Sequence, residues 1–482
     1  MLIKNNKYKY MIKKIKKTKS LFLPLVAIIF VLGGTILLVA FAQGYTFDPA
    51  SRKISTTGLV LIDSSPNDAF ITLNNKFLNK KTPYRYAGLP AGDITISLKK
   101  DQYRSWFSKQ KVVAGEVTFA NYALLLPEVL YQESIAAPSE YSQVLQSSSL
   151  NKTLALSKGS LAIYSLNNDG ENKLLYRPVV PAEATKVVVD LEKLQVSANG
   201  ERALFTQVLA SGERQTIVLH TGDGKFDNLT TEYGFVFSDL RFNPADPNEL
   251  FWLDAGVLKK IKVSEKSISS NLLSSVASLA VTGDRLLVVA QPDTRQASLA
   301  ATSQVQKLSS YSFSGTDEKE ITQLSADTAG FQLGYIKSRY NDYVSVIHSG
   351  SGLLELIRDP YAPSGQSKTS RYDGVKQITV SPNSRFVVLD QLDTMHTLDL
   401  EYDRQYDSQT STAKLQSWAW LDSYHLVLLQ DSQLRLVDFD GQNNQLLTPI
   451  KDVASASISL GSKTLMPLNS EGKLFKLWLV KK

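Results

Sequence analysis

The amino-acid sequence predicts a mainly β protein with one N-terminal transmembrane helix, a small β-sandwich and a large C-terminal β-propeller. Three patterns predict this fold class. An uncharged apolar run covers residues 21–42, short alternating runs fill residues 58–127, and a hairpin-like phrase recurs through residues 128–482. The chain of 482 residues is 43% hydrophobic and 21% charged, which is ordinary for a folded protein of several domains.

The apolar run Leu21 to Ala42 contains no charged residue, and Thr35 is its only polar side chain. At about 1.5 Å per residue, a helix of this length reaches roughly 33 Å and crosses a hydrocarbon core of about 30 Å. We therefore expect a transmembrane helix at 21–42. The alternative is a cleavable signal peptide, because Ala40-Phe41-Ala42 has the form of a cleavage site. The length of the run favours an uncleaved anchor, and both interpretations export the body.

The formal charge of +7 comes from residues 1–20, which contain eight lysines and no acidic residue. The rest of the chain has 45 basic and 46 acidic residues. By the positive-inside rule, the basic stub 1–20 stays in the cytoplasm, and the body beyond the polar linker 43–57 lies outside the cell. A body without excess positive charge argues against a nucleic-acid partner. The absence of cysteine excludes disulfides, thiolate metal sites, a cysteine nucleophile and a lipoprotein anchor.

Residues 58–127 contain five short apolar runs bounded by Pro, Gly, Asn or Asp. These runs predict strands at 59–62, 69–73, 94–98, 111–113 and 117–125. Together they predict a small antiparallel β-sandwich.

Several turn motifs in this segment point to a known module. They are Ser65-Pro66, Asn74-Asn75, Thr82-Pro83 and Leu89-Pro90-Ala91-Gly92, followed by Tyr103 and Trp106 after the next turn. The stretch resembles a PEGA domain, a surface-associated β module, and the resemblance implies the same sandwich fold.

Three aromatic residues of the sandwich, Tyr103, Trp106 and Phe107, are candidates for an exposed patch that binds a polysaccharide or a protein. The competing interpretation is structural, with Tyr103 and Trp106 covering an open end of the sandwich. Burial of Trp106 in the folded protein distinguishes the two.

Residues 128–482 repeat a phrase in which an apolar strand, a polar turn and a second apolar strand follow one another. The copies lie at 195–207, 241–254, 280–290, 336–349, 379–391, 419–431 and 459–470, with a weaker one at 147–157. A second repeated hairpin turns on Asp-Gly or a similar pair, as at Asp223-Gly224 and Asp440-Gly441. Four strands in about 40 residues are typical of a propeller blade. Eight turns favour eight blades, with seven as the alternative.

This repeat resembles the propeller of the Tol-system periplasmic protein and the broader WD-like superfamily. The last apolar run, Lys473 to Val480, is not followed by a fourth strand. We therefore expect Glu128 to Glu133 to supply that strand and to close the ring.

The sequence predicts no catalytic, cofactor-binding or metal-binding residue. The histidines His220, His348, His396 and His425 are far apart, and none has a second histidine at metal-ligand spacing. No phosphate-binding loop, dinucleotide fingerprint or G-x-S-x-G motif is present. We expect structural or surface roles for the histidines, no cofactor, and a protein that is not an enzyme.

These patterns predict a single-pass bacterial membrane protein whose propeller face, outside the cell, binds an envelope protein or a cell-wall polymer. The alternative is an extracytoplasmic hydrolase or lyase with its site in the central channel, where side chains from several blades converge. A cluster of acidic, arginine or histidine side chains facing the channel would favour the enzyme. The fold class alone does not decide between them.

Overall fold

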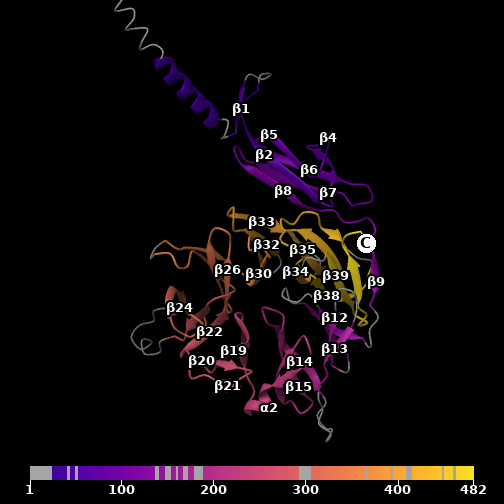
Figure 1. Ribbon diagram of the computed structural model, residues 1–482, viewed down its shortest axis with the longest axis vertical. Coiled ribbons are helices and arrows are strands. Elements are labelled where there is room, and N and C mark those ends of the chain that lie inside the picture. Colours follow the sequence, from indigo (N-terminus) through magenta and orange to yellow (C-terminus); the bar gives the residue numbers. More distant parts are fainter. Residues whose placement is uncertain are drawn as a thin grey trace, which may run out of the picture. The chain divides into compact units, whose positions relative to one another are not determined.

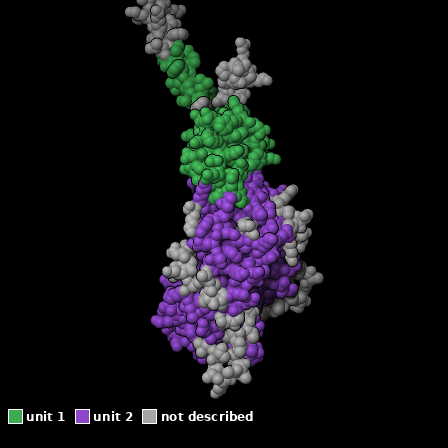
Figure 2. Space-filling view, turned by 90° about the vertical axis from the view of Figure 1, so that its right-hand side faces the viewer, with its two compact units in different colours: residues 1–128 green, residues 129–482 purple. Residues whose placement is uncertain are grey.

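The computed structural model describes residues 24–40, 44–48, 53–135, 140–146, 153–158, 161–166, 172–178, 188–292, 305–363, 366–391, 394–408, 415–447, 450–459 and 463–481. The chain divides into two compact units, residues 1–128 and 129–482, which Figure 2 distinguishes by colour. The expected cytoplasmic stub and residues 41–43 lie outside the described residues.

Residues 24–40 form an α-helix, as predicted for this part of the apolar run. Its large apolar side chains are exposed, Phe30 to 82% and Leu37 to 72%. Among the described residues, no helix is both long enough and apolar enough to cross a membrane.

The first unit contains two four-stranded sheets in its described residues (Figure 1). Its strands are β1 (Tyr45–Asp48), β2 (Lys53–Ser65), β3 (Phe70–Leu73), β4 (Lys76–Lys81), β5 (Tyr84–Pro90), β6 (Gly92–Lys99), β7 (Trp106–Val112) and β8 (Val117–Leu124). In one sheet β2 pairs antiparallel with β1 and β5 and parallel with β8. The other sheet has the order β4-β3-β6-β7 and is antiparallel throughout. The predicted sandwich is therefore present, but its β2–β8 pair is parallel.

Alternating side chains build the core of this unit. Ile71 of β3, Ile96 and Leu98 of β6 and Trp106 of β7 are buried, while their neighbours along each strand face outward. The predicted linker 43–57 is wrong in part, because β1 and the start of β2 already form a ladder there. The polar residues of this hairpin lack the apolar alternation that marks a half-buried strand.

The second unit is built from four-stranded antiparallel sheets, eight of them among its described residues. The first four sheets are β10 (Tyr141–Gln146), β11 (Thr153–Ser157), β12 (Ile163–Leu166) and β13 (Asn172–Tyr176); β14 (Val188–Val196), β15 (Arg202–Leu209), β16 (Arg214–His220) and β17 (Phe226–Asn228); β18 (Asp239–Asn243), β19 (Asp246–Asp254), β20 (Val257–Lys262) and β21 (Ser267–Ile268); and β22 (Val276–Val281), β23 (Leu286–Ala290), β24 (Val305–Tyr311) and β25 (Lys319–Ser325). A short helix, α2 (Leu229–Tyr233), follows β17.

The remaining four sheets continue the same pattern. They are β26 (Phe331–Lys337), β27 (Asp342–His348), β28 (Leu354–Arg358) and β29 (Lys368–Tyr372); β30 (Val375–Val380), β31 (Phe386–Gln391), β32 (Thr394–Asp399) and β33 (Arg404–Ser408); β34 (Leu415–Trp420), β35 (His425–Gln430), β36 (Gln433–Asp438) and β37 (Gln445–Leu446); and β38 (Val453–Ser459), β39 (Thr464–Asn469), β40 (Phe475–Trp478) and β9 (Gln132–Ser134).

Successive sheets follow one another around a ring, which is the arrangement of a β-propeller (Figure 1). First strands of neighbouring sheets touch, as in the pairs β18 and β22, β22 and β26, and β34 and β38. One hydrophobic cluster joins the last sheet to the first, with Met466 and Leu468 packed beside Tyr141 and Ala155. The predicted propeller architecture is confirmed.

The ring is closed by β9, which pairs antiparallel with β40 and places Glu133 opposite Lys476. The sequence predicted this strand at Glu128 to Glu133, and it begins four residues later, at Gln132. The N-terminal and C-terminal strands of the unit therefore share one sheet.

The repeated turns of the sequence join the first and second strands of their sheets. In the β14–β15 turn, Ser197 donates its hydroxyl to Asn199 at 2.8 Å and accepts the N–H five residues after it at 3.0 Å. Ser381 and Asn383 repeat this arrangement between β30 and β31, at 2.7 and 2.9 Å. Serine and asparagine recur because their side chains satisfy turn backbone groups.

Candidate functional site

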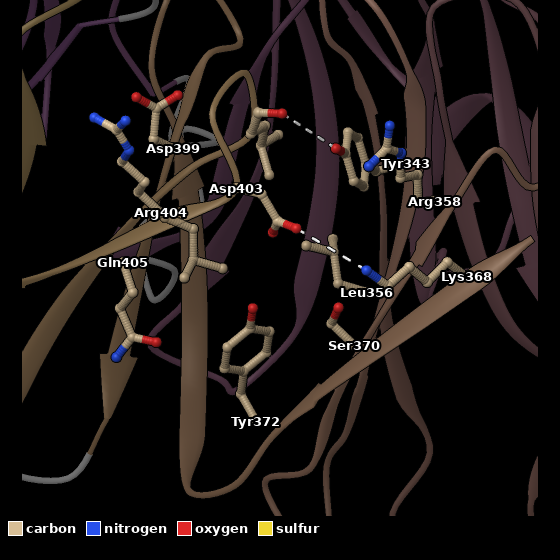
Figure 3. Close-up of a pocket in the computed structure, with 12 residues that line it drawn as sticks. Tyr343, Leu356, Arg358, Lys368, Ser370, Tyr372, Asp399, Asp403, Arg404 and Gln405 are labelled. Carbon is tan, nitrogen blue, oxygen red and sulfur yellow. Dashed lines mark hydrogen bonds and ion pairs between the residues drawn. The ribbon is translucent and has the colours of Figure 1, made fainter. Parts of the chain in front are cut away.

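A polar pocket lies between two neighbouring propeller sheets, β26–β29 and β30–β33, and encloses about 190 Å³ (Figure 3). Twelve residues line it: Tyr343, Leu356, Arg358, Lys368, Ser370, Tyr372, Leu398, Asp399, Leu400, Asp403, Arg404 and Gln405.

Strand geometry brings the polar side chains together. Arg358 of β28 lies opposite Lys368 of β29, and residues two apart on a strand share a face. Lys368, Ser370 and Tyr372 therefore point to one side of their sheet. Arg404, the first residue of β33, approaches from the neighbouring sheet.

One carboxylate of the pocket is committed to a buried ion pair. The side chain of Asp399 is fully buried, and it accepts hydrogen bonds from Nη2 and Nε of Arg385 at 2.7 and 3.1 Å. This two-point contact neutralises the aspartate. Asp399 therefore shapes the pocket without adding free negative charge.

Three cationic groups line the pocket, on Arg358, Lys368 and Arg404. Asp403 lies 4.0 Å from Lys368, with both side chains mostly exposed, and Asp359 lies 3.5 Å from Arg358. Exposed pairs of this kind are worth about 0–1 kcal/mol. An anion entering the pocket therefore has little to displace before it reaches the cations.

Two phenols complete the lining. Burial raises the pKa of Tyr343 and of Tyr372, so both hydroxyls remain protonated at neutral pH. Tyr343 donates to the carbonyl of Leu400 at 3.3 Å. Figure 3 shows the hydroxyls of Tyr372 and Ser370 directed toward the same space as the ammonium of Lys368. The pocket thus combines hydrogen-bond donors with positive charge.

These groups suit a single acidic group of a larger molecule. A volume of about 190 Å³ is below the 300 Å³ or more of sites that enclose a whole drug-sized ligand. Guanidinium groups match the geometry of carboxylate, phosphate or sulfate oxygens, and phenols donate to the same oxygens. Sequence motifs do not reveal this set of residues, because its members come from strands that only the fold makes adjacent.

The first strands of the propeller sheets differ in the number of charged residues that they carry. β10, β22, β34 and β38 contain no charged residue, β26 contains Lys337 and β30 contains Lys376. β14 contains Asp190, Glu192 and Lys193, and Asp239 and Arg241 of β18 pair at 3.4 Å. No histidine occurs in the described residues of these eight strands.

Each histidine contacts a carboxylate of its own sheet or, for His425, of the turn that precedes its strand. The pairs are His220 with Asp227 at 3.6 Å, His348 with Glu355 at 3.3 Å, His396 with Asp407 at 2.9 Å and His425 with Asp422 at 2.8 Å. Among the described residues, no group of three potential ligands is placed to hold a metal ion. The histidines therefore belong to separate structural contacts.

The predicted aromatic patch of the sandwich needs correction. Trp106 is only 1% exposed and packs edge-on against Tyr122, with ring centroids 5.6 Å apart. It points into the core because it shares the inward face of β7 with Ser108. Phe107, one residue on, faces outward and is 42% exposed, while Tyr103 is half-buried. Trp106 is therefore a core residue, and an exposed surface here must be built around Phe107.

Comparison with protein families identifies the sandwich. Residues 57–126 match the PEGA domain. The match agrees with the resemblance expected from the turn motifs. It covers the first unit's strands from within β2 to β8, but not β1 and none of the propeller. No curated protein matches the chain significantly.

Solved structures similar to the chain include the C-terminal WD40 domain of Sif2, at 11% identity and a TM-score of 0.47, covering 73% of this chain and 99% of that one. The β-propeller domain of Myceliophteria thermophila Cps50 (Swd1) has 9% identity and a TM-score of 0.39, with 73% and 100% covered. An oligogalacturonate lyase in complex with manganese has 12% identity and a TM-score of 0.39, with 70% and 97% covered. Similarity at this level carries no argument about function.

Proposed function

We propose that this chain is a non-enzymatic binding and scaffold protein of the bacterial cell envelope. One transmembrane helix at 21–42 anchors it, and the PEGA domain and an eight-bladed propeller lie outside the cell. The propeller recognises an acidic group of an envelope protein or a cell-wall polymer. The observation that carries the proposal is the pocket formed by Arg358, Lys368 and Arg404 with two protonated phenols.

The apolar run and its flanking charge support the anchor. The run is uncharged over residues 21–42, follows eight lysines, and is helical at 24–40 with its apolar side chains exposed. Exposing apolar surface to water costs about 25 cal/mol per Å². A lipid environment removes that cost, and the lysines favour a cytoplasmic N-terminus.

Recognition, rather than bond cleavage, is supported by the state of the polar groups. Asp399 is held by Arg385, and Tyr343 and Tyr372 keep their protons at neutral pH. None of the residues that line the pocket is a histidine. Its one serine, Ser370, therefore has no histidine in the lining to act as its base. These groups bind an anion well but do not form a nucleophile and its base.

Binding is tested with the full chain in lipid nanodiscs, against isolated cell-wall sacculi and against purified envelope proteins. Sacculi are used before and after removal of their phosphodiester-linked polymers. The double variant Lys368→Glu/Arg404→Glu should lower retention at least tenfold, because two attractive charges become repulsive. The control Lys451→Glu changes an exposed lysine outside the pocket and should bind like wild type. Equal retention of the double variant, or no retention of the wild type, overturns the proposal.

Anchoring is tested separately, after expression in a bacterium. Alkaline carbonate should leave the chain in the membrane pellet, and protease added outside the cytoplasmic membrane should digest the body while sparing the N-terminal stub. A mature chain that begins after Ala42 would show cleavage and overturn the anchor.

A further inference from the structure

The outer face of the sheet β4-β3-β6-β7 in the PEGA domain combines lysines with phenylalanines. Cross-strand register defines it, because directly opposed residues point to the same side of a sheet. We call this surface the lysine–phenylalanine face, and it consists of Phe70, Phe77, Lys81, Lys99, Phe107, Lys109 and Lys111.

Two rows of opposed residues form the centre of this face. Phe70 lies opposite Lys81 on one side and Lys99 on the other. In the next row, Thr72 lies opposite Phe77 and Ser97, and Ser97 lies opposite Phe107. Lys109 and Lys111 follow Phe107 on the same side of β7. Lysines thus share a row with Phe70 and follow Phe107 along β7.

The rings of the face are accessible. Phe77 is 57% exposed, Phe107 42% and Phe70 40%, and the four lysines are exposed as well. The ammonium of Lys81 lies 4.7 Å from the ring centre of Phe70, and the Phe70 and Phe77 rings are 5.8 Å apart. Exposed aromatic rings interleaved with lysines are the composition of protein surfaces that lie in a membrane interface.

Charge is divided unequally between the two units. Residues 58–127 contain nine Lys and Arg against five Asp and Glu, whereas residues 129–482 contain 34 against 39. Asp93, opposite Lys111, is the only acidic residue in the register rows of the face. An anionic surface therefore attracts the PEGA domain and repels the propeller.

The connection to the helix is short. Four residues, 41–44, separate the helix at 24–40 from β1, and an extended chain of that length spans about 14 Å. If the helix crosses the bilayer as proposed above, the PEGA domain starts within about two Debye lengths of the lipid headgroups.

We propose that the lysine–phenylalanine face docks on the anionic lipid surface of the membrane in which the chain is anchored. The phenylalanines enter the headgroup region, and the lysines contact lipid phosphates. This inference rests on the proposed anchoring and is independent of what the propeller pocket binds.

The test uses the absence of cysteine in the chain, so that one introduced thiol carries an environment-sensitive fluorophore. Ser97→Cys places the label at the centre of the face, and Asn121→Cys on β8 places it on the outer face of the other sheet. The labelled full chain is placed in nanodiscs of phosphatidylcholine alone or mixed with phosphatidylglycerol. We expect a blue shift at Ser97→Cys only in the anionic discs, reversed by high salt, and none at Asn121→Cys.

Charge reversal provides the matched comparison. Lys99→Glu/Lys109→Glu should abolish the shift, while Lys76→Glu/Arg85→Glu, with the same charge change outside the face, should keep it. Identical spectra in both lipids, or a shift produced by a soluble anionic polymer but not by anionic lipid, overturns the proposal. A chain that does not enter nanodiscs contradicts the anchor, and the face is then tested with vesicles of the same two compositions.

Discussion

The Nδ1 atom of buried His425 lies 2.8 Å from the carboxylate of Asp422, three residues earlier. Its Nε2 atom lies 3.6 Å from the buried carboxylate of Asp438. Burial by itself lowers the pKa of His425, but the hydrogen bond to Asp422 and the charge of Asp438 outweigh it and raise the pKa above its usual value. For Asp422, burial alone raises the pKa, and the bond from His425 reverses this and lowers it. The His425 ring thus lies between two carboxylates, one in the turn before β35 and one on β36.

This contact predicts a pH-dependent stability. A histidine whose pKa is raised in the folded state stabilises fully below its unfolded pKa of about 6.5, and the effect is lost as pH rises through the folded value. The free energy of unfolding, measured with denaturant, should therefore fall as the buffer is taken upward from about pH 6.5. His425→Gln should remove this slope, whereas His220→Gln, at a half-exposed histidine, should keep it. An unchanged slope in His425→Gln would contradict the assignment.

The stability of the PEGA domain should depend on Trp106 and little on its neighbour. Trp106→Ala empties a fully buried site and should cost about 3–5 kcal/mol in the unfolding of the first unit. Phe107→Ala, on the outward face of the same strand, should change it by about 0.5 kcal/mol or less. Calorimetry of both variants measures the difference, and equal melting temperatures would contradict the inward orientation of Trp106.

Closure of the propeller ring can be tested at single backbone positions. The bonds from Trp478 N–H to the Tyr131 carbonyl (3.0 Å) and from Ile135 N–H to the Leu474 carbonyl (2.9 Å) lie on either side of the Glu133–Lys476 pair. Because hydrogen-bonded pairs alternate in an antiparallel ladder, the N–H of Glu133 points to β40.

We therefore expect Glu133→Pro to cost about 2–3 kcal/mol of propeller stability, through a lost ladder bond. Gln132→Pro is the matched control on the same outermost strand, at a position whose N–H does not face β40, and it should cost clearly less. The comparison is made by denaturant unfolding. A Gln132→Pro variant as unstable as Glu133→Pro would show that the register is different.

The buried pair of Arg385 and Asp399 should be essential to the stability of the sheet β30–β33. Asp399→Asn removes the charge that faces a guanidinium only 17% exposed, and it should cost about 3–5 kcal/mol. Asp403→Asn, at a mostly exposed aspartate of the same pocket, should change stability by about 1 kcal/mol or less. Chemical unfolding of the two variants provides the measurement, and a neutral Asp399→Asn would refute the role of the pair.

Repetition made the propeller predictable from sequence. Each copy of the strand–turn–strand phrase corresponds to the hairpin of the first two strands of a sheet. It can be recognised because the turn needs Ser, Asn, Asp or Gly at fixed places and the strands need apolar side chains. The β1–β2 hairpin was missed because its residues, such as Thr46 and Ser55, are polar and show no apolar alternation. For Trp106 the sequence allowed both an exposed patch and a structural role, because neighbouring residues on a strand face opposite sides and sequence alone does not say which side is the core. Its burial supports the structural role.

Local patterning was sufficient for the β class, the hairpin repeat, the PEGA-like sandwich and the helical apolar run, because turn chemistry and strand alternation act between residues close in the chain. The pocket and the lysine–phenylalanine face depended on tertiary structure. Lys368 and Arg404 line the same pocket from two neighbouring sheets. Phe77 of β4 and Phe107 of β7 share one row of the register, with β3 and β6 between them. Such neighbours are created by strand register and sheet packing, which no spacing in the sequence expresses. The uncharged run Leu21 to Ala42 needs no such contacts to indicate an anchor, because a bilayer selects for length and hydrophobicity alone.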